Sequence, residues 1–156
     1  MEIKIEINNL TDSPVVKNFF QKIFRCVLSQ LKLKNLENKT ISLSLALVSG
    51  KEMKKMNKTY RKRNTSTDVL SFCEFEKTDE LRKTTLKKIF LGEIILCYTD
   101  IKEYARKKNK NLREELGEVF AHGVLHTLGF SHSSKMFRIQ KNAVKKIIEN
   151  LTKKEK

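Results

Sequence analysis

The sequence has only three cysteines among its 156 residues, and they are widely spaced. Cys26, Cys73 and Cys97 are odd in number and form no C-x-x-C pair, which argues against a disulfide framework and against a cysteine zinc knuckle. No apolar stretch approaches the length of a membrane helix. The N-terminus alternates charge with isoleucine, whereas a signal peptide has an uninterrupted apolar stretch. We therefore expect a cytoplasmic protein that does not contact a membrane.

Acidic residues are scarce relative to basic ones. The sequence has 33 Lys and Arg against 18 Asp and Glu, which gives a formal net charge of +15 at pH 7. Such an excess favours a polyanionic partner, of which nucleic acid is the natural example. The alternative is a general bias toward lysine, because 26 of the 33 basic residues are Lys. Such a bias would place many lysines on the surface without a binding role.

Hydrophobic periodicity predicts a single α/β domain over residues 1–156. Alternation with a period of two predicts four strands, at Ile3–Ile7, Ile41–Ser49, Val69–Phe75 and Phe90–Tyr98. The last strand is apolar on both faces and is therefore expected to be central. Helical spacing predicts helices at Val15–Leu31, Asp100–Lys108, Asn111–Leu128 and Ser134–Leu151, and a short helix that has Met53, Met56 and Tyr60 on one face and ends in the basic run Arg61–Arg63. This order is typical of a mixed four-stranded sheet packed by helices.

Several residues mark the expected boundaries of these elements. Asp12, Ser13 and Pro14 supply the chemistry of a helix start. Asn111 and Glu114 resemble a capping box, and Gly129 stands where a left-handed helix terminator is expected. The charged connection from 76 to 88 is the best candidate for a mobile loop.

All three histidines fall within eleven residues, in the segment H-G-V-L-H-T-L-G-F-S-H. His122 and His126 are four residues apart on a predicted helix, so their imidazoles project from one side at a separation that lets two nitrogens reach one metal ion. Gly129 can end the helix and reverse the chain, which would carry His132 to the same point. Three nitrogen ligands with a fourth position left for water or substrate are typical of a catalytic zinc site, here at the end of a C-terminal helix.

The alternative is that these are ordinary surface or core histidines. At about 100° per residue, the apolar stripe of this helix is centred nearly opposite His122 and His126, which are therefore not core residues of its main apolar face. The stripe consists of Leu116, Phe120, Gly123, Val124, Thr127 and Leu128. Solvated histidines would have no reason to adopt this spacing. The pattern favours a site for one Zn²⁺, or another divalent metal, per chain.

The metzincin proteases share this spacing, in the pattern H-E-x-x-H-x-x-G-x-x-H, where Glu is the general base. Gly123 occupies the position of that Glu. A residue without a side chain cannot accept a proton, so the usual metalloprotease mechanism loses its base. Hydrolysis remains available with the metal as Lewis acid and another residue stabilising charge.

Three segments in the same order resemble the YbeY family of bacterial metal-dependent endoribonucleases. The histidine segment is similar to that family's H-G-x-L-H-L-x-G-Y-D-H. The segment M-N-K-T-Y-R-K-R-N-T-S-T-D-V-L-S-F, from Met56 to Phe72, resembles L-N-x-x-Y-R-x-x-x-x-P-T-D-V-L-S-F, and L-G-E-I at Leu91–Ile94 resembles L-G-D-I. The resemblance implies an α/β domain, zinc ligation by His122, His126 and His132, and cleavage of RNA.

The sequence departs from the family pattern near the third histidine. Ser131 stands where the family usually has Asp, which removes a carboxylate able to orient an imidazole or accept a proton. Glu118, one helical turn before His122, is a candidate substitute on the same face. Ser66 and Cys73 stand where proline is common.

The resemblance also assigns Arg61 a catalytic role beside His122. A guanidinium near the metal can bind a phosphate with two N–H groups and stabilise the charge that develops on its oxygens. The alternative, a generic basic residue, is weakened by the scarcity of Arg, with seven against 26 Lys. Asp68 is either a hydrogen-bonding residue at the entry to a strand, which we favour, or an acid close to the metal ligands.

Other basic and aromatic residues are candidates for RNA contacts. The basic candidates, which could follow an RNA backbone, are Lys62, Arg63, Lys107, Lys108 and Lys110. Tyr60 and Phe130 could stack on bases, but their spacing serves core packing equally well and we favour packing.

We therefore expect a cytoplasmic, zinc-dependent endoribonuclease specific for single strands. The resemblance implies the ribosomal RNA of the small subunit as its partner, with roles in maturation of the 16S rRNA 3' end, ribosome biogenesis and ribosome quality control. One alternative is a non-catalytic ribosome-assembly factor stabilised by its metal, which the lack of an obvious general base favours. A metallopeptidase is a weaker alternative, because Gly123 and the +15 charge oppose it.

Overall fold

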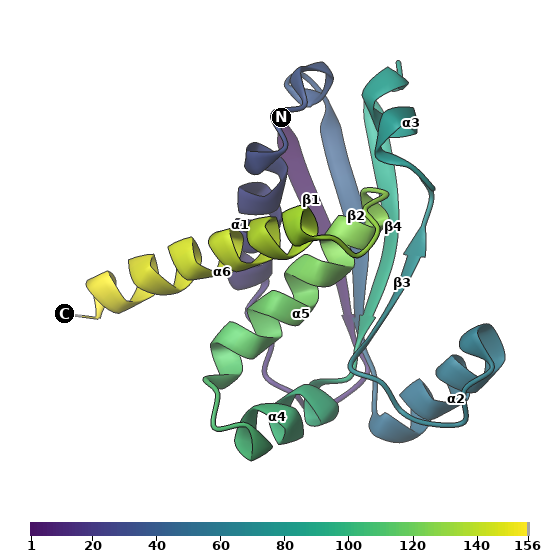
Figure 1. Ribbon diagram of the computed structural model, residues 1–156, viewed down its shortest axis with the longest axis vertical. Helices are drawn as coiled ribbons and strands as arrows, with labels where there is room; N and C mark the ends of the chain where they lie inside the picture. Colours follow the sequence, from purple (N-terminus) through teal and green to yellow (C-terminus); the bar gives the residue numbers. More distant parts are fainter. Residues whose placement is uncertain (156) are drawn as a thin grey trace.

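The computed structural model describes residues 1–155 and has a mixed sheet of four strands at its centre (Figure 1). The strands are β1 (Glu2–Asn9), β2 (Thr40–Leu47), β3 (Val69–Cys73) and β4 (Lys88–Leu96). Their order is β1-β2-β4-β3, with β1, β2 and β4 parallel and β3 antiparallel to β4. The predicted single-domain α/β architecture, its four-stranded mixed sheet and the internal position of the fourth strand are confirmed; Lys156, the end of the predicted domain, lies outside the described residues.

Three helices cover one face of the sheet: α1 (Lys17–Gln30), α5 (Leu112–Thr127) and α6 (Ser134–Lys154) (Figure 1). They contact one another, and their apolar sides bury the inward-facing side chains of the strands in one core. In the described chain, no helix is both long enough and apolar enough to cross a membrane.

Helix α2 (Gly50–Arg61) packs on the opposite face of the sheet. Its Met53 is fully buried and belongs to a second, smaller apolar cluster with Leu70 of β3 and Ile95 of β4. Helix α4 (Tyr98–Lys107) follows β4 and contacts α5. This arrangement places the end of α2 beside the edge strand β3, on which the candidate site depends.

The prediction of a loop over the whole connection from 76 to 88 is wrong. The segment contains helix α3 (Thr78–Lys83), and its Leu81 is fully buried in the main core. A short 3-10 turn (Lys34–Leu36) connects α1 to β2. The side-chain amide of its Asn35 donates a hydrogen bond of 3.0 Å to the Leu81 carbonyl. One buried leucine and this hydrogen bond tie the segment to the core, although its charge suggested a solvated loop.

The predicted element boundaries shift by a few residues for local reasons. Asp12, Ser13 and Pro14 do not start α1, because Asn9 and Ser13 form a hydrogen-bonded turn and the helix begins at Lys17. β2 ends at Leu47 since the Ser49 hydroxyl caps α2 by accepting from the backbone N–H of residue 52. β3 ends at Cys73, before the predicted end at residue 75. The predicted fourth strand starts two residues earlier, at 88, and ends at 96.

Candidate metal centre

Helix α5 holds the first two histidines. Its N-terminus is capped as predicted, with the Asn111 side chain accepting a hydrogen bond of 3.0 Å from the backbone N–H of Glu114. The predicted apolar stripe is buried, but so are Ala121 and Leu125, because α5 lies between the sheet and the other helices. His122 and His126 are half-buried, one turn apart. The helix is therefore a rigid support for both imidazoles.

The close approach of α5 to the sheet depends on Gly123. A Cβ atom at this position would lie 3.0 Å from Cγ2 of Ile94 and 3.3 Å from the Ser71 hydroxyl oxygen. The residue that replaces the metzincin Glu is thus a packing contact with β3 and β4. This contact sets the height of the histidines above the edge strand.

Gly129 reverses the chain at the end of α5. Its φ of +84° lies in the left-handed region, its N–H bonds to the His126 carbonyl at 2.9 Å, and the N–H of Phe130 bonds to the Leu125 carbonyl at 3.1 Å. This pair of bonds is a Schellman motif. The predicted terminator is confirmed, and the reversal returns His132 to the two histidines of the helix.

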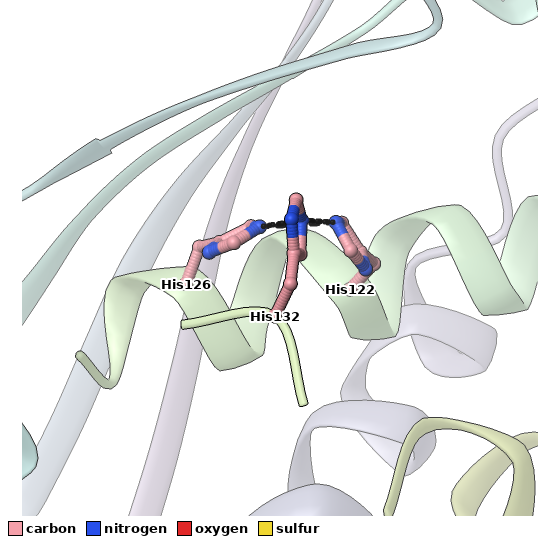
Figure 2. Close-up of side chains that lie close together, drawn as sticks. All are labelled: His122, His126 and His132. Atoms are coloured by element: carbon pink, nitrogen blue, oxygen red, sulfur yellow. Dashed lines mark hydrogen bonds between the residues drawn. The ribbon is translucent and has the colours of Figure 1, made fainter. Parts of the chain in front are cut away.

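The three imidazoles converge on one point, as their spacing predicted (Figure 2). Nε2 of His126 lies 3.0 Å from Nε2 of His122 and 3.2 Å from Nε2 of His132, and the remaining Nε2 pair is 3.2 Å apart. His132 is exposed, so the cluster opens to solvent on its side.

The other ring nitrogens of the two helical histidines have partners of their own. Nδ1 of His122 lies 3.0 Å from Oε1 of Gln140 in α6, and Nδ1 of His126 lies 3.0 Å from the carbonyl oxygen of Phe130. Because these oxygens accept, each Nδ1 carries the proton, and each Nε2 of a neutral ring presents a lone pair. Burial is the largest effect on both rings and lowers the pKa of each, which favours the neutral form.

Lone pairs that converge from neutral imidazoles repel one another unless a cation lies between them. A tetrahedral zinc ion with bonds of about 2.0–2.1 Å to nitrogen requires ligand nitrogens roughly 3.3–3.4 Å apart. The observed separations of 3.0–3.2 Å are close to that requirement. The three side chains therefore fit a divalent metal ion with nitrogen ligands.

The histidines form one wall of an open cleft of about 630 Å³. The other wall comes from the end of α2, the loop from 62 to 68 and the edge strand β3. Asn57, which is buried, donates a hydrogen bond of 2.8 Å to the Thr65 carbonyl and so fixes this loop. The cleft combines the histidine cluster with polar and basic groups from a different part of the sequence.

Arg61 lies in this cleft, where the sequence predicted a site residue. Its Nη2 donates a hydrogen bond of 3.1 Å to the carbonyl oxygen of Ser71, and its guanidinium carbon lies 6.0 Å from the ring centroid of Phe72. Its positive charge also lowers the pKa of His126, although less than burial does. The guanidinium is thus oriented by β3 in the same cleft as the histidines.

Asp68 is the only carboxylate that lines the cleft within residues 1–155. Desolvation by the surrounding cleft raises the pKa of the Asp68 carboxyl group, although the residue is exposed, while hydrogen bonds from the backbone N–H of Val69 and from its own N–H oppose that rise. Its carbonyl accepts a hydrogen bond of 2.9 Å from the N–H of Cys97 at the entry to β3. The residue therefore holds the strand in place and also faces the histidine cluster.

The remaining predicted residues lie in different places. Arg63 lines the cleft, and Lys62 adopts a left-handed conformation at the end of α2. Lys107, Lys108 and Lys110 lie at the opposite end of α5 from the histidines. Two of these lysines have acidic partners, at 3.2 Å for the pair Lys107 with Glu103 and 3.7 Å for the pair Lys110 with Glu115.

Within residues 1–155, neither Glu118 nor Ser131 has a hydrogen bond to a histidine ring. Burial raises the pKa of Glu118, and the neighbouring carboxylates of Glu115 and Glu114 add to that effect. Gln140, and not Glu118, faces Nδ1 of His122. Ser131 is exposed.

The two aromatic candidates differ in their surroundings. Tyr60 is exposed and packs edge-on against Phe72, with ring centroids 5.1 Å apart. Phe130 is half-buried and packs against the main core. The favoured core packing is confirmed for Phe130 and is wrong for Tyr60, which packs on Phe72 at the surface.

A family model described as Endoribonuclease YbeY matches residues 5–153. The chain belongs to the YbeY family. It is 34% identical over 126 residues to an Endoribonuclease YbeY of Thermodesulfovibrio yellowstonii, covering 80% of this chain and 74% of the relative. It is 30% identical to one from Phytoplasma australiense, covering 93% and 96%. The solution structure of a Thermotoga maritima protein is similar, with a TM-score of 0.61, 26% identity and coverage of 97% and 93%.

Sequence reasoning missed two residues of the site in this YbeY family member. Gln140 interrupts the apolar face of α6 and is one of only a few buried polar side chains among the described residues, so its place in that face was the available signal. Cys73 lines the cleft, and its thiol donates to the His126 carbonyl at 3.1 Å. Partial desolvation raises the pKa of this thiol, although the residue is exposed. The available signal for Cys73 was its position on β3, because it follows Val69 and Ser71 at every second residue and therefore lies on the same face of the strand.

Proposed function

We propose that this chain is a zinc-dependent endoribonuclease specific for single strands, with residues 1–156 acting as one catalytic domain. The observation that carries the proposal is the convergence of three Nε2 atoms beside Arg61 in one open cleft. Membership of a family described as Endoribonuclease YbeY supports the choice of RNA as substrate. One Zn²⁺ per chain, or another divalent metal, is the cofactor.

His122, His126 and His132 are the ligands in this proposal. A divalent ion held by these three nitrogens would supply Lewis acidity toward a phosphoryl oxygen and a water molecule. Gln140 and the Phe130 carbonyl hold the rings of His122 and His126 with their Nε2 atoms toward the ion. Such partners fix the ring orientation of metal-binding histidines.

Arg61 binds the scissile phosphate. One N–H of its guanidinium is committed to the Ser71 carbonyl, which leaves further N–H groups to contact the non-bridging oxygens. These donors are oriented before the substrate arrives, so they stabilise the developing negative charge without reorganisation. Asp68 lies in the same cleft, and its raised pKa suits a group that holds a proton during the reaction.

The positive surface provides general attraction for RNA. Lys62 and Arg63 lie beside the cleft, whereas Lys107, Lys108 and Lys110 are candidates for more distant phosphates. We propose precursor small-subunit ribosomal RNA as the substrate, with roles in maturation of the 16S rRNA 3' end, ribosome biogenesis and quality control in the cytoplasm. Family membership supports RNA as the substrate, and the choice of ribosomal RNA rests on the resemblance of the histidine segment and of Met56–Phe72 to that family.

A non-catalytic assembly factor and a metallopeptidase remain the alternatives, and one experiment separates all three. The zinc-loaded protein is incubated with labelled single-stranded RNA, double-stranded RNA and casein. The proposal predicts cleavage of the single-stranded RNA alone. RNA binding without cleavage would favour the assembly factor, and cleavage of casein would favour the peptidase.

A further inference from the structure

The surface that extends from the histidine cluster along α6 has no part in the function proposed above. α6 begins two residues after His132 and runs past α1 toward the C-terminal end of the described chain (Figure 1). Its 21 residues span about 30 Å. The helix contains seven basic residues and one acidic residue, Glu149. It is therefore a strongly basic element in direct continuity with the cluster.

The basic residues of α6 gather on its exposed side. The buried residues recur at helical spacing and are Met136, Ile139, Gln140, Ala143, Val144 and Ile147. Arg138 and Lys145 lie on the opposite side, two turns apart, and Lys141 lies next to them. All three are exposed. Glu149, 4.0 Å from the Lys145 ammonium, is the single acidic residue of the helix. The half of α6 nearest the histidines therefore has basic residues and no acidic residue of its own.

An exposed aromatic ring stands between this basic face and the histidines. Phe137, the fourth residue of α6, is 44% exposed. Its ring centroid lies 6.0 Å from that of His122 and 6.1 Å from that of His132, with interplanar angles of 29° and 19°. A ring at this place can stack on an unpaired base next to a phosphate held by the cluster.

The route toward the other basic candidates is less favourable for a polyanion. Lys107, Lys108 and Lys110 are separated from His122 by the first half of α5, which carries Glu114, Glu115 and Glu118. An RNA strand that followed α5 would pass these carboxylates. Over the first turns of α6 every charged residue of the helix is basic, and the carboxylate that interacts with them electrostatically is that of Glu118, beside Lys141.

We propose that Phe137, Arg138, Lys141 and Lys145 form a docking surface for the part of a single-stranded RNA that flanks the cleavage point. This proposal rests on the proposed function, because that function places the scissile phosphate at the histidine cluster. Charge complementarity and continuity with the cleft select RNA as the occupant. Phe137 stacks on a base, and the three basic side chains contact successive phosphates along the helix.

The test compares two double variants of the full-length zinc-loaded protein. Arg138→Gln/Lys145→Gln removes two charges from α6. Lys4→Gln/Lys88→Gln removes two charges from exposed positions that alternate with the buried Ile3 and Ile89, and therefore from the sheet face opposite α6. Binding of a long labelled single-stranded RNA is measured over a range of salt concentrations, and cleavage of that RNA and of a dinucleotide is followed.

We expect the α6 variant to bind the long RNA several-fold more weakly and to lower the slope of log Kd against log salt by about 1.4, which corresponds to two lost single-strand phosphate contacts. Its cleavage of the dinucleotide should equal that of the wild type. Phe137→Leu should weaken binding without changing the salt slope, at unchanged zinc content.

Two results would overturn the docking surface while leaving the proposed function intact. In the first, the wild-type protein cleaves RNA and the α6 variant binds the long RNA with unchanged affinity. The other is an equal loss of affinity in the sheet-face variant, which would show that only net charge matters. A wild-type protein that neither binds nor cleaves RNA would instead reject the proposed function, and the docking surface with it.

Discussion

Gln140 offers a sharp test of the metal centre, because it lies outside the ligand set and 18 positions away from His122 in the sequence. Its side chain is buried, and Oε1 lies 3.0 Å from Nδ1 of His122. Replacement by Leu keeps most of the volume and removes the acceptor that holds the imidazole. The ring then loses the partner that fixes its orientation and leaves a buried N–H without a hydrogen bond.

The expected loss of zinc affinity for Gln140→Leu is tenfold to a hundredfold, the range typical for removal of a partner behind a metal-binding histidine. This corresponds to about 1.4–2.7 kcal/mol. At a fixed free zinc concentration well above both dissociation constants, the stabilisation of the fold by zinc falls by the same amount. For a chain of this size the melting temperature of the zinc-loaded protein should fall by about 3–10 °C.

The measurement is a competition titration with a chelator of known affinity, combined with thermal unfolding with and without zinc. Gln30→Leu is the matched control. The Gln30 amide donates a hydrogen bond to the Ile139 carbonyl of α6 but has no hydrogen bond to a histidine. It should lower the stability of both forms without changing zinc affinity. A zinc Kd for Gln140→Leu within twofold of wild type would refute the reasoning.

Three further predictions follow from the same geometry. Arg61→Lys keeps the charge but loses the planar donor that β3 orients, so single-turnover cleavage should fall roughly a hundredfold while RNA affinity changes only a few-fold; a wild-type rate at saturating RNA would contradict this. Gly129→Ala places a Cβ 2.4 Å from the backbone nitrogen of Thr78 at a positive φ, so the free energy of unfolding should fall by at least about 1–2 kcal/mol. Gly50→Ala is the control, because no atom lies within 3.8 Å of the added Cβ. Burial lowers the pKa of His126, so the zinc-free folded state binds a proton less readily than the unfolded chain and loses stability as the pH falls below about 6.5. The melting temperatures of zinc-free wild type and His126→Gln, measured between pH 7.5 and 5.5, should therefore converge as the pH falls. A constant difference between the two melting temperatures would contradict the assignment.

The parts of the fold and site that could be predicted from the sequence rest on local patterns. Alternation along Ile41–Leu47 gives a strand directly, since one face of it must be buried. The spacing of His122, His126 and His132 with Gly129 determines their convergence, because helix geometry and one left-handed residue are enough to bring the three rings together. These features need no knowledge of the rest of the chain.

Other parts depend on partners that are distant in the sequence. The order of α3 follows from one buried leucine, Leu81, and from polar contacts such as that with Asn35, which the charge of the segment conceals. Gln140 reaches His122 only because α6 packs on α5, and hydrophobic periodicity gives no angle for that packing. The same holds for the pairing of Arg61 with the Ser71 carbonyl, which requires α2 to end beside the edge strand.

The central claim is that the histidine cluster binds one metal ion that is required for RNA cleavage. The most direct measurement compares untagged wild type with His126→Ala for metal content and for cleavage of the same single-stranded RNA, with RNA binding measured in parallel. The account predicts about one equivalent of zinc or another divalent metal in the wild type, and loss of most of the metal and of all detectable cleavage in the variant, at RNA affinity within a few-fold. Equal metal content in the two proteins, or undiminished cleavage by His126→Ala, would contradict it.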